Sequence, residues 1–232
     1  MNINELRKAC EDINITLNDA QLHQLELYAR LLQEWNEKIN LTAITETEEI
    51  YEKHFYDSLL PAKDIEMKGT AADVGTGAGF PGLVWKIAFP SLHVVLIEPT
   101  GKRCTFLKEV ISQLKLKDIE VYNERAEEHV SSHREAYDIV TARAVANLRV
   151  LSELCIPLLK KDGLFIAMKG SMGHQEALDA KNAMDKLGCS LEKEEDTSLA
   201  EGDNRVILFY RKTRNTPAMY PRNYGQIKKK PL

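Results

Sequence analysis

The stretch Ala72-Asp73-Val74-Gly75-Thr76-Gly77-Ala78-Gly79-Phe80-Pro81-Gly82 decides the fold class, because it reads as the end of a buried strand, a glycine-rich turn and the start of a helix. Glycine permits a tight turn and lets a ligand come close to the backbone. Pro81 suits a first helical turn, where its missing N–H would have no partner. The stretch therefore predicts a βα unit with a nucleotide-like ligand at its turn.

From Thr70 onward, short apolar runs alternate with helical stretches, which indicates repeated βα units and a parallel sheet. The expected strands are 71–75, 93–98, 119–123, 137–142 and 163–169, and the expected helices are 82–88, 102–116, 148–159 and 175–187. No helix-length insert separates 189–197 from 205–211, only the turn-like Glu201-Gly202-Asp203-Asn204. These two segments predict an antiparallel hairpin on the sheet edge, so the fold class is α/β with a mixed sheet.

The residues ahead of the sheet predict a helical N-terminal region. Apolar residues recur at helical spacing over 18–39, where Asn18 is the N-cap candidate, and over 47–60, which stops at Pro61. A shorter helix is expected over 3–10. We therefore divide the chain into a helical cap (1–65), the sheet domain (66–212) and a basic C-terminal tail (213–232).

The composition predicts a globular, intracellular protein. At 232 residues and 44% hydrophobic, the chain has enough apolar surface for one substantial core, which excludes disorder as its main state. The four cysteines form no C-x-x-C pair and no His/Cys cluster, so we expect neither disulfides nor a metal site. No segment has the apolar length of a secretory signal or a membrane span, so we expect a cytoplasmic protein that does not contact the membrane.

The net charge of −4 conceals an asymmetry between the tail and the rest of the chain. Residues 1–210 carry 24 basic and 35 acidic residues, whereas the last 22 residues carry seven basic residues and no acidic ones. We expect this segment to be extended or disordered alone and to order on RNA, although a solubilising tail is the alternative. Deleting 214–232 should then weaken RNA binding and spare cofactor binding. The candidate RNA contacts here are Arg214, Arg222, Lys228, Lys229 and Lys230.

Two ligand classes compete for the glycine-rich turn. Residues 77–82 satisfy the G-x-G-x-x-G fingerprint of nicotinamide dinucleotide sites, whereas Asp73-x-Gly75-x-Gly77-x-Gly79 resembles the first motif of S-adenosylmethionine-dependent methyltransferases. Glu98 closes the next strand, where a carboxylate can accept hydrogen bonds from both ribose hydroxyls. We favour the methyltransferase frame because Asp73 lies just inside the strand and no second domain remains to hold a hydride acceptor.

A series of motifs in chain order resembles the RsmG family, also called the glucose-inhibited division protein B family. The motifs are Asn40-Leu41-Thr42, His54-Phe55-Tyr56-Asp57-Ser58-Leu59, Asp73 to Gly82, Gly101-Lys102-Arg103, Thr141-Ala142-Arg143-Ala144 and Met168-Lys169-Gly170. The resemblance covers nearly the whole chain. It implies a class I, Rossmann-like methyltransferase that uses S-adenosylmethionine to methylate guanine N7 in 16S ribosomal RNA, alone or in the small ribosomal subunit.

The resemblance also implies site residues. The cofactor would contact Gly75, Gly77, Gly79 and Phe80, with Glu98 on its ribose and Ala126-Glu127 at its adenine; without the family, the acidic stretch around Glu127 reads as solvated. Arg143 would bind the cofactor carboxylate, a substrate phosphate or the guanine O6, unless it forms a strand-end ion pair with Asp138 or Glu153. His54 and Lys169 are further candidate RNA contacts, and an ordinary exposed lysine is the alternative at position 169.

The chemistry of guanine N7 predicts which catalytic groups the protein needs. N7 has a free lone pair and no proton, so methyl transfer requires alignment and no general base. His54, Asp57 and Ser58 do not have the arrangement of a catalytic triad, and Cys155 reads as a core residue. Besides the methyltransferase, a nicotinamide-dependent oxidoreductase and a non-catalytic RNA-binding ribosome assembly factor stay open. We favour a monomer.

Overall fold

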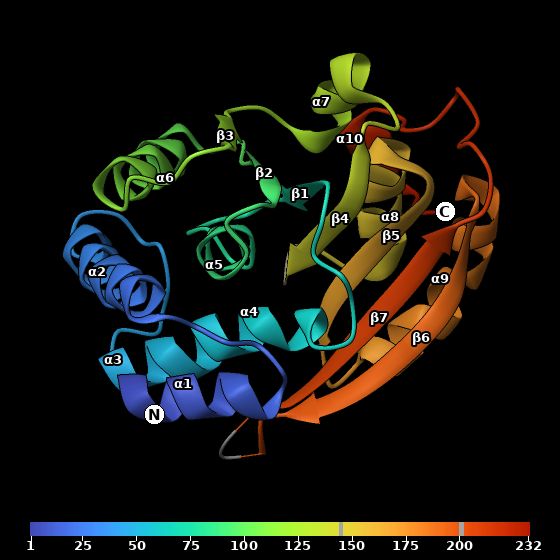
Figure 1. Cartoon of the computed structure of the whole chain (residues 1–232). Coiled ribbons are helices and arrows are strands. Elements are labelled where there is room, and N and C mark those ends of the chain that lie inside the picture. Colours follow the sequence, from blue (N-terminus) through green and yellow to red (C-terminus); the bar gives the residue numbers. More distant parts are fainter. Residues whose placement is uncertain (144–145, 200–201) are drawn as a thin grey trace.

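Seven strands form one mixed sheet in the computed structural model, which describes residues 1–143, 146–199 and 202–232 (Figure 1). The strand order is β3-β2-β1-β4-β5-β7-β6. The strands β1 to β5 pair in parallel, whereas β7 is antiparallel to β5 and β6 is antiparallel to β7. The sequence-based prediction of a mixed sheet with a terminal hairpin is confirmed, although Glu201 of its expected turn lies outside the described residues. The bounds are β1 Thr70–Val74, β2 His93–Ile97, β3 Ile119–Tyr122, β4 Tyr137–Arg143, β5 Leu159–Gly170, β6 Cys189–Ser198 and β7 Asn204–Lys212.

Helices connect the strands as expected, and two further helices were not anticipated. The sheet-domain helices are α5 Gly82–Ala88, α6 Gly101–Gln113, α7 Ala126–His133, α8 Leu148–Cys155 with the 3₁₀ turn η3 Ile156–Leu158, α9 Gly173–Leu187 and α10 Tyr224–Lys229. The unexpected helices are α7 and α10. In α7 the carboxylate of Glu128 accepts a hydrogen bond from the Arg125 backbone N–H, 3.1 Å away, so the acidic stretch stabilises a helix N-terminus.

The N-terminal region is helical, as predicted. It comprises α1 Ile3–Asp12, α2 Asp19–Asn36, and a continuous helical rod made of α3 Thr47–Glu49, the π-helical η1 Ile50–Tyr56, α4 Asp57–Leu59 and the 3₁₀ turn η2 Leu60–Ala62. Asn18 caps α2, because its side chain accepts a hydrogen bond from the Gln21 N–H (2.9 Å) and the Gln21 side chain accepts one from the Asn18 N–H (2.9 Å). Among the described residues, no helix is long and apolar enough to cross a lipid bilayer.

The two faces of the sheet bury different sets of helices. Side chains alternate along each strand, so Ala71 of β1 belongs to one core and Ala72 to the other. The first core joins the sheet to the N-terminal helices, α5 and α6; the second joins it to α7, α8, α9 and α10. The N-terminal helices therefore share their core with the sheet. This packing brings the rod 47–62 close to the carboxyl ends of the strands (Figure 1).

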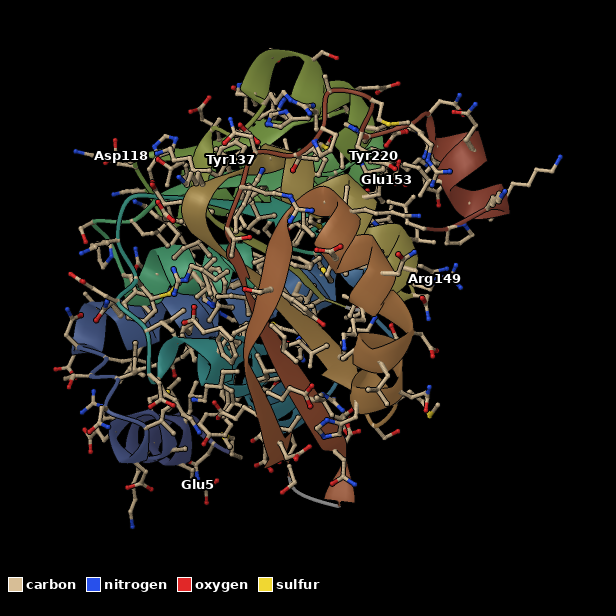
Figure 2. All side chains as sticks on the ribbon, turned by 90° about the vertical axis from the view of Figure 1, so that its right-hand side faces the viewer. Glu5, Asp118, Tyr137, Arg149, Glu153 and Tyr220 are labelled. Carbon is tan, nitrogen blue, oxygen red and sulfur yellow. The ribbon has the colours of Figure 1, made fainter. Side chains whose placement is uncertain are left out.

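The C-terminal tail packs against the second core, so the expectation of an extended or disordered segment is wrong. Ile227 of α10 is fully buried, and Tyr220, which is labelled in Figure 2, is nearly so. Arg222 forms an ion pair with the buried Glu153, with Nη2 and Oε2 2.6 Å apart. Arg149 donates to the carbonyl of Pro231 (2.9 Å). Charge alone predicted a solvated segment, but its few apolar side chains and the buried Glu153 hold it on the domain.

Candidate functional site

The glycine-rich turn is closed by Asp73, the last but one residue of β1. One carboxylate oxygen, Oδ2, accepts hydrogen bonds from the Thr76 hydroxyl (2.6 Å) and the Gly82 N–H (2.8 Å). Burial raises the pKa of Asp73 to about 6. A Cβ on Gly82 would lie 2.4 Å from Leu96 Cδ2, so Gly82 is needed for close packing of α5 on β2. Asp73 therefore determines the shape of the turn from beneath it.

Two of the three predicted ligand glycines line a cavity of about 380 Å³, and the third does not. Gly75 and Gly77 have φ angles of 68° and 62°, the left-handed region that favours glycine. A Cβ on Gly77 would meet only the carbonyl oxygen of Gly75, 4.0 Å away, so the turn leaves open space there. A Cβ on Gly79 would instead meet Leu83 at 2.3 Å and the hydroxyl of Tyr28 at 2.6 Å. Gly79 allows the turn to pack against α2.

Glu98, directly after β2, lines the same cavity and is only 2% exposed. Its two carboxylate oxygens accept hydrogen bonds from the N–H groups of Gly77 (3.0 Å) and Thr100 (2.8 Å). Each oxygen keeps a second lone pair for a ligand hydroxyl. Ala126 and Glu127 begin α7 and are not among the lining residues. The lining comprises Leu41, Thr42, His54, Gly75, Thr76, Gly77, Ala78, Phe80, Glu98, Pro99, Thr100, Arg103 and Arg143.

Two of these lining side chains pack on the ring of Phe80. The His54 ring stacks on it with centroids 4.4 Å apart, and the Arg143 guanidinium lies 4.9 Å from its centroid. Arg143 Nη2 donates to His54 Nδ1 at 3.1 Å, so the imidazole proton is on Nε2, which donates to the Thr42 hydroxyl at 2.8 Å. Burial and the neighbouring Arg143 lower the pKa of His54 to about 3. His54 is therefore neutral and nearly buried, and serves as an acceptor for Arg143.

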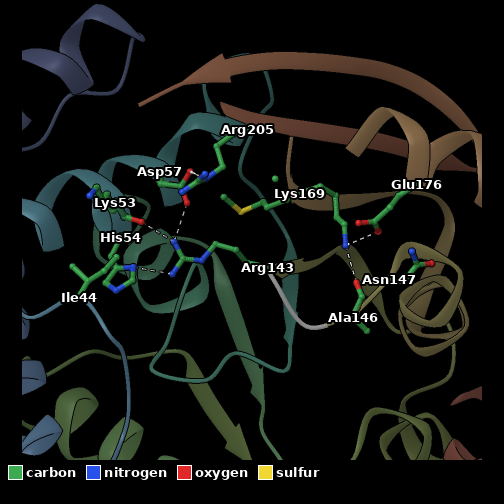
Figure 3. Close-up of a pocket in the computed structure, with 12 residues that line it drawn as sticks. Ile44, Lys53, His54, Asp57, Arg143, Ala146, Asn147, Lys169, Glu176 and Arg205 are labelled. Atoms are coloured by element: carbon green, nitrogen blue, oxygen red, sulfur yellow. Dashed lines mark hydrogen bonds and ion pairs between the residues drawn. The ribbon is translucent and has the colours of Figure 1, made fainter. Parts of the chain in front are cut away.

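Arg143 ends β4 and is held by the N-terminal rod. Its Nη1 donates to the Lys53 carbonyl (3.2 Å) and to Asp57 Oδ2 (3.0 Å). The expected ion-pair partners were wrong, because Asp138 pairs with Lys160 and Glu153 with Arg222. The other oxygen of Asp57 lies 3.3 Å from Arg205 Nε. Asp57 thus links β4 to β7 through two arginines (Figure 3).

A second cavity, of about 600 Å³, shares Arg143 and His54 with the first. Its lining comprises Ile44, Lys53, His54, Asp57, Arg143, Ala146, Asn147, Met168, Lys169, Gly170, Glu176 and Arg205. Lys169 donates to the Ala146 carbonyl (2.7 Å) and pairs with Glu176 (2.8 Å) (Figure 3). It is 7% exposed, so the alternative of an ordinary exposed lysine is wrong. We name the first cavity the glycine-loop cavity and the second the outer cavity.

The remaining RNA candidates lie away from both cavities. Arg222 forms an ion pair with Glu153, and Arg214 Nη1 lies 3.5 Å from Asp185 Oδ1. The side chains of Lys228, Lys229 and Lys230, at the end of α10 and just after it, are exposed. Ala144 of the fourth-strand motif lies outside the described residues. Sequence reasoning missed Arg205 and Glu176, because each joins the site only when β7 pairs with β5 and α9 packs against α8. The sequence offered one signal for these two residues: Arg205 lies at the start of β7, and Glu176 lies in the first turn of α9.

The sheet order, the glycine turn after β1 and the acidic residue after β2 together define the class I methyltransferase fold. The precorrin-6y C5,15-methyltransferase of Geobacter metallireducens GS-15 has a similar structure, with a TM-score of 0.54 at 11% identity, over 75% of this chain and 92% of that chain. An rRNA methylase from Streptococcus thermophilus has a TM-score of 0.50 at 12% identity, over 68% and 94% of the two chains.

Residues 21–205 match the family model described as rRNA small subunit methyltransferase G. The ribosomal RNA small subunit methyltransferase G of Bacillus pumilus (strain SAFR-032) is 47% identical over 237 residues, which cover 100% of this chain and 99% of that protein. The chain therefore belongs to the rRNA small subunit methyltransferase G family. This membership confirms the resemblance found in the motifs and contradicts the nicotinamide oxidoreductase alternative.

Proposed function

We propose that this protein transfers a methyl group from S-adenosylmethionine to N7 of a guanine in 16S ribosomal RNA. The observation that carries the proposal is the pair of adjoining cavities, which share Arg143 and His54 in their common wall. The glycine-loop cavity would hold the methyl donor and the outer cavity the acceptor. The family and the printed name of the Bacillus pumilus relative supply the RNA class.

The glycine-loop cavity fits S-adenosylmethionine. The open space above Gly77 admits a ligand close to the backbone, and the buried Glu98 has acceptor capacity left for ribose hydroxyls. The guanidinium of Arg143 offers donors to a carboxylate. Ala126 and Glu127 follow β3 and remain our candidates for the adenine end. When bound, S-adenosylmethionine supplies an electrophilic methyl group on a sulfonium.

The chain needs to bind and orient, and needs no group to remove a proton. Guanine N7 presents a lone pair, so the rate depends on how well the two reactants are aligned. The wall between the cavities is suited to this task because Arg143 is held by three partners and rests on Phe80. The RNA substrate supports a cytoplasmic location, and a monomeric enzyme stays our expectation.

The direct test is incubation with labelled S-adenosylmethionine and small ribosomal subunits, or their RNA, that lack the modification. We expect label in N7-methylguanine at one position of 16S RNA after nucleoside mapping. No N7-methylguanine, with an active control enzyme in parallel, would contradict the proposal. Tight RNA binding without methylation would support the non-catalytic assembly factor instead.

Replacing Glu98 should weaken cofactor binding. In Glu98→Gln the neutral amide loses charge-assisted hydrogen bonds, each worth roughly 1.5 to 3 kcal/mol, so we expect S-adenosylhomocysteine to bind about 10- to 100-fold more weakly. Calorimetric titration measures this, and Glu109→Gln on the exposed face of α6 is the matched control. Equal affinities for Glu98→Gln and wild type would remove Glu98 from the cofactor site.

The exposed lysines after Ile227 test the RNA contribution of the tail without disturbing its packing. We expect replacement of Lys228, Lys229 and Lys230 by glutamine to weaken RNA binding and to reduce the salt dependence, by up to about 2 in the slope of log K against log salt concentration. Filter binding over a salt series measures both. An unchanged slope would show that the tail lysines do not contact RNA.

A further inference from the structure

The outer cavity combines apolar walls with paired charges. Ile44, Ala146 and Met168 supply apolar surface. The lysines and arginines of the lining each have an acidic partner. Arg143 and Arg205 flank Asp57, and Lys169 pairs with Glu176 (Figure 3). A cavity whose charges are neutralised in this way and whose walls are partly apolar is better suited to a planar base than to a free phosphate.

Two carboxylates line the outer cavity, and they differ in how much hydrogen-bonding capacity they have left. Both oxygens of Asp57 face arginines, at 3.0 and 3.3 Å. Glu176, in the first turn of α9, uses Oε2 to accept from the Leu148 N–H (2.7 Å) and from Lys169 (2.8 Å). Within the part of the chain that the structure describes, these contacts leave Oε1 without a bonded donor. Glu176 is therefore the acidic group with an oxygen available to a ligand.

We propose that the outer cavity holds the target guanine and that Glu176 recognises its Watson–Crick edge. This inference rests on the proposed function. Guanine presents N1–H and the 2-amino group as neighbouring donors on that edge, and an ionised carboxylate only accepts. Adenine has an acceptor at N1, which a carboxylate would repel. N7 lies on the Hoogsteen edge, so a guanine held at Glu176 keeps N7 free for the methyl donor.

Lys169 is a positioning residue in this arrangement. Its ammonium group lies between the carboxylate of Glu176 and the carbonyl of Ala146, and it is nearly buried. It thereby orients the carboxylate and balances its charge, while the Leu148 N–H at the start of α8 fixes Oε2. The two contacts restrict Glu176 to one orientation before RNA binds.

The test compares guanosine with inosine at the methylated position of the RNA, because inosine lacks the 2-amino group and retains N7. For the wild type we expect kcat/KM to be roughly 10- to 100-fold lower on inosine, the effect of losing one hydrogen bond to a charged acceptor. Glu176→Gln keeps an acceptor for Leu148 N–H but loses the charge. In this variant we expect lower activity on guanosine and an inosine penalty of about threefold or less.

Asp179→Asn, on the exposed side of the same helix, is the matched control and should retain the full inosine penalty. S-adenosylhomocysteine binding and thermal unfolding of each variant report on the cofactor site and the fold. An equal inosine penalty in wild type and Glu176→Gln would overturn the assignment, because another group would then recognise the 2-amino group. No penalty in the wild type would overturn it too, because the 2-amino group would then not be recognised. A wild type that is inactive on the guanosine RNA would instead contradict the proposed function, and the assignment with it.

Discussion

Arg143→Lys should lower kcat/KM for RNA methylation by about 10²- to 10³-fold, equivalent to about 3 to 4 kcal/mol of transition-state stabilisation. The substitution keeps the positive charge and removes the planar fork. Arg143 uses that fork to reach the Lys53 carbonyl, Asp57 and His54 at once, and its flat face rests on Phe80. A lysine ammonium cannot make this set of contacts, so the wall between the two cavities would lose its geometry.

Single-turnover methylation with labelled S-adenosylmethionine measures the effect on the chemical step. The control is Arg211→Lys on β7, which pairs with the exposed Glu192 and lies outside both cavities. We expect this control to stay within about twofold of the wild type, as surface substitutions generally do. If Arg143→Lys matched the control in kcat/KM, Arg143 would be a structural ion pair and the wall between the cavities would have no role in alignment.

Local sequence signals were enough to predict most of the sheet and the meeting of Gly77 with Glu98 in the glycine-loop cavity. Helix α5 begins and ends where Pro81 and the apolar run place it, and Asn18 caps α2 through the expected reciprocal hydrogen bonds. Gly77 and Glu98 meet because the carboxyl ends of adjacent parallel strands lie at one edge of the sheet. These features depend on neighbours in sequence or on strand order, and both can be inferred from patterns.

The contacts that join the N-terminal helices to the sheet depend on packing between distant segments, which patterns do not determine. Asp57 lies 86 positions from Arg143, and it becomes the partner of Arg143 only because the N-terminal rod packs against the strand ends. Gly79 matches a ligand-binding motif, yet the hydroxyl of Tyr28 occupies the space a side chain would need. In both cases the deciding contact comes from the N-terminal helices. The periodicity of α2 and of the rod predicts helices but does not say where they lie over the sheet.

The prediction about the tail failed for the same reason, because contacts with distant segments hold the tail on the domain. The structure therefore changes the expected result of deleting residues 214–232. That deletion was expected to spare cofactor binding, but the structure predicts that it destabilises the whole domain. It removes the buried side chain of Ile227 and leaves Glu153, which is fully buried, without Arg222. A buried carboxylate that loses its partner costs about 3 to 5 kcal/mol, which is comparable with the total stability of many domains.

A single substitution isolates the packing part of this effect. Ile227→Asp places a carboxylate at a fully buried position and should reduce the free energy of unfolding by about 3 to 5 kcal/mol, because it removes apolar contacts and buries an unpaired charge. Gln226→Asp introduces the same charge one residue earlier at an exposed position, so we expect a change of about 0.5 kcal/mol or less. Urea unfolding followed by circular dichroism measures both. Equal stability of the two variants would mean that α10 detaches freely in solution, and the tail would then again be available as a flexible RNA-binding segment.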